Sequence, residues 1–356
     1  MVVHRKVTIK ELAEHAGVAT ATVSRVLNNS GYVREETRRR VESAVAESGY
    51  VPDASARQLR GKSSKLIGLV IPSVRNVFYT MLAEAVEHTL RDEDYTMLLG
   101  VSQEDPRLFI DYLESFWQRG VDGVLYVPPA HGTLRREIRR LALQGLPMVE
   151  VNRRQEEELL DGVVADNFRG AYQATEYLIQ LGHTRIGLIV GTQETITGRH
   201  RVQGYERALR EAQIAVEPEL VKIGEFAKDH AVEATNELLR LNPPPTAIFA
   251  ASNRLVLGTM AALMDREVLV PADISVIGFD DVEWLQYFNP PITTVDIAVD
   301  RMATLSVELL LRRVREGVLP ERPRTYSLST MLIERRSCRR LTPEEASPQA
   351  GAPGAG

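Results

Sequence analysis

The sequence predicts an all-α helix-turn-helix domain at the N-terminus, followed by a larger α/β body with two lobes of parallel sheet. Three observations support this fold class. Residues 8–49 have the apolar spacing of short helices. From residue 66 onward, apolar runs of strand length alternate with amphipathic stretches of helix length, as in parallel sheets covered by helices. The chain has 356 residues, which is too long for one ordinary core, and its many elements exceed one typical sheet.

This pattern divides the chain into four segments. Residues 1–52 form the helical domain, and 53–65 form a small, polar and basic linker or a marginal helix. The two-lobed body covers 66–338. The tail, 339–356, is rich in Pro, Gly and Ala, and we expect it to be disordered.

In the N-terminal domain, the first helix begins at Thr8, which can form a capping box with Glu11. Gly17 ends this helix and can supply a left-handed turn. A second helix follows from Ala19 to Leu27, and a third over 35–47 closes the core. The predicted core consists of apolar residues from all three helices and the turn: Ile9, Leu12, Ala13, Ala16, Val18, Val23, Val26, Leu27, Val41, Ala44 and Val45.

In the body, the elements fall into two series, one up to residue 151 and one from residue 162. Strands are expected at 66–71, 96–101, 123–127, 147–151, 162–165, 185–191, 220–226, 247–252 and 274–280. Helices are expected at 79–92, 106–119, 133–144, 168–181, 199–212, 229–241 and 254–267. Gly68 and Gly187 stand in similar strand sequences, KLIGLVIPS and TRIGLIVGT, which fits two similar lobes, although any buried parallel strand has this composition.

Charge is distributed unevenly along the chain. Residues 1–65 contain 12 Lys and Arg against 7 Asp and Glu, whereas the whole chain has a formal net charge of −5. A basic head on an acidic body is compatible with nucleic-acid binding, but charge alone does not decide it. The single cysteine, Cys338, excludes an internal disulfide and a Cys-rich metal site. Because no signal-peptide or membrane-spanning pattern is present, we expect a cytoplasmic protein.

The second helix has a polar face that suits DNA. Its side chains are short or hydrogen-bonding with a single long cation, so the face fits a major groove: Thr20, Ala21, Thr22, Ser24, Arg25 and Asn28. The alternative is a generic three-helix domain or a protein-interaction module.

Eight motifs along the chain carry a family resemblance. In order, they are VATATVSRVLNN, GYVPDASARQLRGKSS, LIGLVIPSVRNVFY, GVDGVLYVPP, LGHTRIGLIVG, PPPTAIFAASN, VPADISVIGFDDV and NPPITTV. From Thr8 to about Arg336, the chain resembles the LacI/GalR family of bacterial repressors. The resemblance implies a lambda-repressor-like helix-turn-helix domain and a periplasmic-binding-protein-like body that binds a small-molecule effector, and it implies no other cofactor.

The resemblance also implies how operator DNA is contacted. Thr20, Ala21 and Arg25 hold the positions that read bases, and Arg25 is expected to donate a bidentate pair to a guanine. Phosphate contact or packing is expected for Thr8, Thr22, Ser24, Asn28, Tyr32 and Tyr50, and for Tyr50 core packing is an equal alternative.

Residues 53–61 match the family's hinge helix, in which paired leucines pry open a central base step. Leu59 holds the wedge position, with Ala56, Gln58 and Gly61 around it. Two hinge helices meeting at one step imply a homodimer on a near-palindromic operator, with a central CG step. A tetramer formed by pairing of dimers is left open.

The effector is expected between the two lobes, beyond the carboxyl ends of the strands. The family's contact positions match Asn76, Phe78, Tyr79, Asn152, Asp166, Thr195, Thr197, Arg201, Phe226, Ser252 and Asp280. An Arg and an Asp converging on a polar ligand with flanking aromatic rings suit a sugar or polyol. Acids at strand ends, such as Asp166 and Asp280, can instead cap the next helix.

Two departures from the family pattern bear on the effector. Asn152 stands where relatives often have Asp, and Ser252-Asn253 replaces a common Asn-Asp pair. Fewer carboxylates favour an acidic sugar, and Arg153, Arg154 and Arg199 nearby fit that hypothesis, although surface arginines are common.

Two other functional classes are disfavoured. An enzyme is disfavoured because phosphate-binding glycine loops are absent, and His183 and His200 have no clear nucleophile or metal constellation. A transport-type sugar receptor would share the body, but it would need an export signal and no helix-turn-helix domain.

Overall fold

The computed structural model describes residues 9–27, 32–48, 63–132, 134–154, 159–316 and 323–346. The chain forms two compact units, Met1–Ser64 and Lys65–Gly356. The predicted fold class is confirmed: the first unit contains helices, and the second contains two sheets covered by helices. Within the described ranges, no helix is long and apolar enough to span a membrane.

The first unit is built from α1 (Ile9–Ala16), α2 (Thr20–Leu27) and α3 (Glu35–Ser48). Its core contains Leu12, Val23 and Val41, all fully buried. Gly17 ends α1 with a φ of 61°, a left-handed conformation that favours glycine. Nη2 of Arg40 donates to the carbonyl oxygens of Ala16 and Gly17 at 2.7 and 3.1 Å, so α3 holds the turn between α1 and α2.

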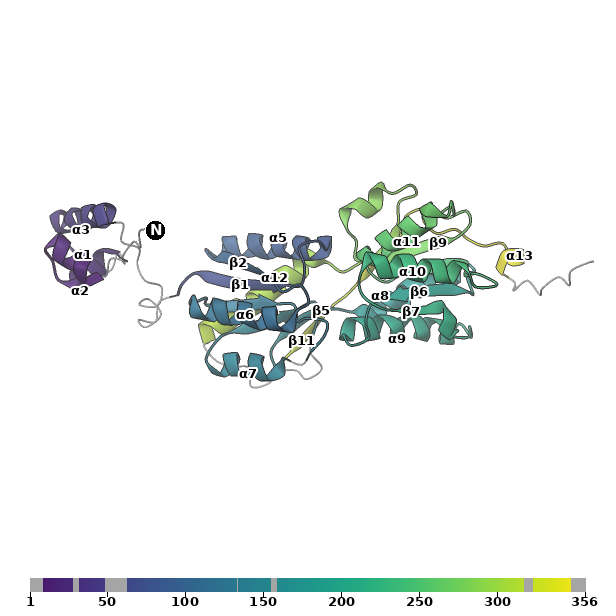
Figure 1. Ribbon diagram of the computed structural model, residues 1–356, viewed down its shortest axis with the longest axis horizontal. Coiled ribbons are helices and arrows are strands. Elements are labelled where there is room, and N and C mark those ends of the chain that lie inside the picture. The colour runs from purple at the N-terminus through teal and green to yellow at the C-terminus, as the bar shows by residue number, and fades with distance from the viewer. Residues whose placement is uncertain are drawn as a thin grey trace, which may run out of the picture. The chain divides into compact units, whose positions relative to one another are not determined.

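The second unit contains two six-stranded sheets, which define a first and a second lobe (Figure 1). In sheet order, the first lobe has β11 (Thr325–Leu328), β5 (Gly162–Ala165), β4 (Met148–Val151), β3 (Gly123–Tyr126), β1 (Leu66–Ile71) and β2 (Thr96–Val101). The second has β12 (Met331–Ile333), β10 (Thr293–Asp296), β9 (Ser275–Phe279), β8 (Ala247–Ala250), β6 (Ile186–Val190) and β7 (Val221–Ile223). All pairings are parallel except β10 with β12.

Helices cover both sheets. In the first lobe they are α5 (Val77–Asp92), α6 (Pro106–Gln118), α7 (Arg135–Leu143) and α12 (Val299–Glu316). In the second they are α8 (Asn167–Gln180), α9 (Ile196–Glu211), α10 (Lys228–Leu239) and α11 (Asn253–Asp265), with short 3-10 turns at Pro218–Leu220 and Glu283–Tyr287. Along β1, Leu69 and Val70 enter different apolar clusters, because successive strand residues point to opposite faces.

The two sheets share one strand order, and Gly68 and Gly187 occupy equivalent strands. Gly68 lies on β1, between β2 and β3, and Gly187 lies on β6, between β7 and β8. A Cβ at Gly68 would lie 2.4 Å from Cδ2 of Phe116, and one at Gly187 would lie 2.8 Å from Cδ1 of Leu238. The echo in sequence therefore reflects the same close approach of a helix in both lobes.

The chain crosses between the lobes three times: after β5, after β10 and after β11. The strand at 162–165, which the sequence pattern groups with the second series, therefore lies in the first sheet, where it pairs with β4 and β11. Hydrophobic periodicity identifies a strand but does not select its neighbours, which explains this difference.

The C-terminal segment also differs from the expectation of a disordered tail that begins at residue 339. Residues 339–346 are ordered: Leu341 is buried, and its backbone N–H donates to the carbonyl of Leu181 at 2.8 Å. A short helix, α13 (Pro343–Ala346), follows, and Arg339 pairs with Glu345 at 3.0 Å. Leu341 is a single apolar residue in a charged segment, so hydrophobic periodicity does not predict that this segment packs against the second lobe. The rest of the tail lies outside the described residues.

Candidate DNA-reading surface and effector cleft

The face of α2 opposite its core residues is open to solvent. Thr20, Ala21 and Arg25 are exposed, and Thr22 and Ser24 are half-buried. Val23 and Val26 hold the other side of α2 against the core, so the predicted base-reading side chains share the accessible face. Tyr32, just before α3, is 90% exposed. The predicted contacts Thr8, Asn28, Tyr50, Ala56 and Leu59 lie outside the described residues.

The candidate effector cleft lies between the lobes, at the carboxyl ends of strands from both sheets. In each sheet the strand order reverses direction at the first strand, β1 or β6, which is where open α/β sheets bind ligands. An inner hollow of about 30 Å³ at this place is lined by Asn76, Phe78, Tyr79, Asn152, Arg153, Thr197, Arg201, Phe226, Ser252 and Asp280. Nine of the eleven predicted effector positions therefore meet at one point.

Arg201 and Asp280 form a buried pair on the second-lobe side of the cleft. Nη2 of Arg201 donates to Oδ1 of Asp280 at 3.3 Å, and its Nε donates to Oδ1 of Asn167 at 2.9 Å. The guanidinium stacks 3.7 Å above the ring centroid of Phe279. Burial lowers the pKa of Arg201 and outweighs the opposing effect of Asp280. The arrangement holds a hydrogen-bonding fork and a carboxylate in fixed positions.

Asn76 and Asn253 join the lobes across the cleft. Nδ2 of Asn253 donates to Oδ1 of Asn76 at 3.0 Å. The same oxygen accepts from the backbone N–H of Phe78 at 3.2 Å and caps α5. Asn253 also donates to Asp280 at 3.3 Å. The sequence pattern did not predict Asn253 as a site residue, although Asn253 directly follows the predicted site residue Ser252 at the start of α11.

Aromatic rings and a second arginine form the middle of the cleft. The guanidinium carbon of Arg153 lies 5.9 Å from the ring centroids of both Tyr79 and Phe226, and that of Arg201 lies 5.9 Å from Phe226. The ring of Phe226 thus has two cations within the range of cation–π attraction. Burial raises the pKa of Tyr79 to about 12, so its phenol stays protonated and can serve as a donor.

Arg153 is fixed by an acidic partner that the sequence pattern did not identify. Its Nη1 donates to the two carboxylate oxygens of Glu104 at 2.8 and 3.0 Å. Glu104 also accepts from the backbone N–H of Ala130 at 2.7 Å. The Arg153 side chain is buried, with 7% exposed, whereas Glu104 is 36% exposed.

Two predicted effector residues do not line the hollow. Oδ1 of Asp166 accepts from the backbone N–H of Arg169 at 2.9 Å, and Oγ1 of Thr195 accepts from that of Gly198 at 3.0 Å. They cap α8 and α9, which is the alternative role that acids and hydroxyls have at strand ends.

The other two arginines of the acidic-sugar hypothesis also have different partners. Arg154 donates to Oγ1 of Thr325 at 2.7 Å and to the carbonyl of Leu160 at 2.6 Å. Arg199 donates to the carbonyl of Gln193 at 2.8 Å. Of the three arginines in that hypothesis, only Arg153 lines the cleft.

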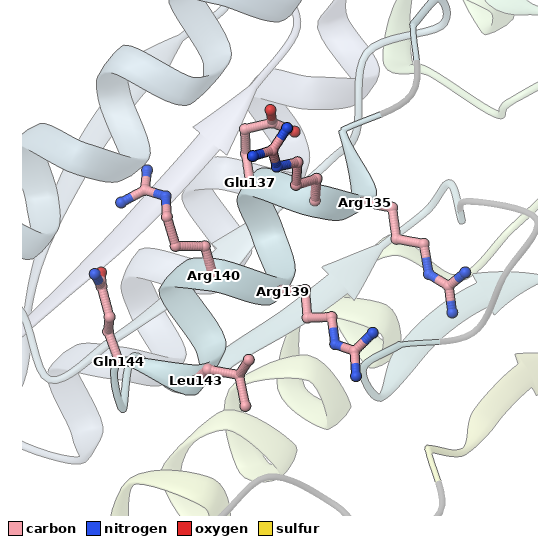
Figure 2. Close-up of a pocket in the computed structure, with 7 residues that line it drawn as sticks. Arg135, Glu137, Arg139, Arg140, Leu143 and Gln144 are labelled. Carbon is pink, nitrogen blue, oxygen red and sulfur yellow. The ribbon is translucent and has the colours of Figure 1, made fainter.

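A larger hollow, of about 780 Å³, lies elsewhere, along the outer surface of α7 (Figure 2). In Figure 2 the labelled side chain of Arg140 extends away from those of Arg135 and Arg139, so the three guanidinium groups do not converge on one ligand. The cleft between the lobes, where buried polar groups converge, is the better candidate site. Across the described parts of the chain, no group of three or more His, Cys, Asp or Glu is placed to hold a metal ion.

Comparison with known proteins agrees with this arrangement. Residues 8–53 match the model of the bacterial regulatory proteins of the lacI family, and residues 175–338 match that of a periplasmic binding protein-like domain. The chain is 32% identical over 334 residues to the HTH-type transcriptional repressor PurR of Actinobacillus pleuropneumoniae serotype 3 (strain JL03), covering 94% of this chain and 99% of that protein.

Solved structures give the same assignment. The transcriptional regulator CelR in complex with cellobiose is 31% identical, with a TM-score of 0.69 over 93% of this chain and 100% of that one. The lac repressor dimer bound to operator and the anti-inducer ONPF is 25% identical, with a TM-score of 0.78 over 94% and 100% of the two chains. The chain belongs to the LacI family of bacterial regulatory proteins and is a DNA-binding transcriptional repressor rather than an enzyme.

Proposed function

We propose that this repressor binds a near-palindromic operator as a homodimer and is controlled by a sugar or sugar derivative bound between its lobes. The observation that supports the effector class is the Arg201–Asp280 pair, which presents fixed donors and acceptors beside the ring of Phe226. Paired polar groups next to an aromatic face suit a ligand with several hydroxyls and an apolar ring side. The likeness to a regulator in complex with cellobiose supports the same class.

The exposed face of α2 is the proposed reader, with Thr20, Ala21 and Arg25 toward bases. The predicted contacts at Thr8, Asn28, Tyr50, Ala56 and Leu59 remain part of this proposal on the strength of the family resemblance. We place the regulator in the cytoplasm, on the nucleoid when bound to DNA. The effector acts only if its affinity differs between two states of the protein, and the link between the two units is the proposed bistable element.

Selection of binding sites from random DNA tests the operator proposal. Enriched sites with two-fold symmetry and a central CG step are expected, and asymmetric enriched sites would contradict a dimeric reader. A gel shift on the enriched site, with and without sugars, sugar acids and nucleosides, tests the effector class. A shift that responds to nucleosides alone would overturn the sugar proposal.

A further inference from the structure

Beside the inner hollow lies a second, outer hollow of about 490 Å³. The two share Asn76, Tyr79, Arg153 and Phe226 in their linings, so they adjoin. The inner hollow, at about 30 Å³, has room for little more than one water molecule. A ligand bound with the lobes in this arrangement would therefore have most of its atoms in the outer hollow.

The outer hollow is strongly positive. Its lining includes Arg75, Arg153 and Arg254, against a single acidic residue, Glu104. In the inner hollow, by contrast, Arg201 is matched by Asp280. Glu104 pairs with Arg153, and Glu225 also acts on Arg153 from a longer distance. Two arginines of the outer hollow are left without a carboxylate partner among the residues that the structure describes.

These two arginines come from different lobes. Arg75 follows β1, and Arg254 lies in the first turn of α11. Nη1 of Arg254 donates to the backbone carbonyl of Arg75 at 3.4 Å, so the two residues adjoin across the cleft. Arg254 is half-buried and Arg75 exposed, and their guanidinium groups retain donors for a ligand. An anion held here would contact both lobes at once.

We propose that the outer hollow is an anion subsite, and that the effector is a sugar derivative with a carboxylate or phosphate group. This inference rests on the proposed sugar function and adds the charge of the ligand. Arginine forks bind both anions in bidentate geometry. One sugar hydroxyl would enter the inner hollow toward Arg201 and Asp280, and the anionic group would face Arg75 and Arg254, with Arg153 between them.

The test is isothermal titration of the full-length protein with matched sets of ligands. Each set contains a neutral sugar, its uronic and aldonic acids and its phosphate ester, for the common hexoses and pentoses. The acid or the phosphate of at least one set is expected to bind about tenfold or more tightly than its neutral parent, the effect of one charge-assisted contact. The two acidic arms distinguish carboxylate from phosphate.

Variants connect the preference to the subsite. Arg254→Gln is expected to remove most of the advantage of the anionic ligand while the affinity for the neutral parent changes little. Arg139→Gln, a substitution on the surface of α7, is the matched control and should change neither. Circular dichroism verifies that both variants fold.

Two results would overturn the inference in different ways. Tight binding of a neutral sugar, with equal or weaker binding of its acid and phosphate, would refute the anion subsite and leave the proposed sugar function intact. Binding of no sugar, neutral or anionic, would refute the proposed function, and the inference would fall with it.

Discussion

Nδ1 of His131, in the first lobe, lies 2.7 Å from Oε2 of Glu194, in the second lobe. Nε2 of the same imidazole lies 3.4 Å from Oε1 of Glu225, also in the second lobe. The hydrogen bond that the imidazole donates to Glu194, with the charges of Glu225, Glu194 and Glu104, raises the pKa of His131 above its usual 6.5. The link is therefore strongest when the histidine is protonated.

We expect this link to stabilise the protein in mild acid. Its contribution is fully present below the unfolded-state pKa of about 6.5 and is lost as pH rises through the raised folded-state pKa of His131. The melting temperature of the native protein, compared with that of His131→Gln, should show a gap that is widest below pH 6.5 and narrows as the pH rises. His88→Gln, at an exposed histidine on α5, is the control. A gap that does not change with pH would contradict the assignment.

The opposite behaviour is expected of His183, which is fully buried. Its Nε2 donates to the carbonyl of Arg339 at 3.1 Å, which leaves Nδ1 to accept from the hydroxyl of Thr246 at 2.9 Å. Burial lowers its pKa to about 4. Because the unfolded chain then binds a proton that the folded chain does not, stability falls as pH drops from 6.5 toward 4.

The lowered pKa of His183 should change the free energy of unfolding by about 3 kcal/mol at most, since a tenfold change in proton affinity corresponds to about 1.36 kcal/mol. Urea unfolding from pH 7.5 to 4.5 measures this change. The native protein should lose more stability over this range than His183→Gln, which has no titrating ring. Parallel curves for the two proteins would show that His183 does not titrate in this way.

Removing only one charge of the Arg201–Asp280 pair should destabilise the second lobe more than removing both charges. Asp280→Asn leaves the buried guanidinium without its counter-charge, and a loss of about 3–5 kcal/mol in the free energy of unfolding is expected. The double variant Arg201→Met/Asp280→Asn should recover part of this loss. Urea unfolding of Asp280→Asn, Arg201→Met and the double variant measures the coupling between the two side chains. If the losses in the free energy of unfolding are additive, the two side chains do not interact directly.

The exposed guanidinium of Arg25 should matter to DNA recognition and little to folding. Arg25→Ala is expected to cost about 1–3 kcal/mol of operator binding, roughly fivefold to 150-fold in Kd. Fluorescence anisotropy with the selected operator, and with operators altered at single guanines, measures both affinity and lost discrimination. Arg39→Ala, an exposed arginine on α3, serves as the comparison and should lower affinity equally for all sequences, if at all.

Much of the second unit follows from hydrophobic periodicity. The expected strand at 66–71 matches β1, and the expected helix at 229–241 matches α10 to within two residues at each end, because buried parallel strands and amphipathic helices have distinct apolar spacing. Periodicity could not place β5 in the first sheet, since pairing depends on contacts distant in sequence. The sequence pattern predicts neither α12 nor β11, although their hydrophobic residues complete the first lobe.

Single residues of the site were harder to predict than the site itself. Asn76, Tyr79 and Arg201 reach the hollow, whereas Asp166 and Thr195 turn back to cap their own helices. Asp280 and Thr197, which are of the same residue types as the two capping residues, do line the hollow. Residue type near a strand end therefore does not decide between the two outcomes, and the path of the backbone does. Glu104 and His131 have their roles through partners on distant segments, which no local pattern reveals.

The three passages between the lobes affect how the protein is made. Synthesis of the first lobe starts at Leu66, but its last strand, Thr325–Leu328, emerges from the ribosome only after the whole of β6 to β10. Neither sheet is complete until its last strand, Thr325–Leu328 in the first lobe and Met331–Ile333 in the second, has been made. The helices between Ile9 and Ser48 have a core of their own and are finished first. A stop codon just before Thr325 would therefore remove a strand from both halves of the sensor together and leave the coding region of the DNA reader intact.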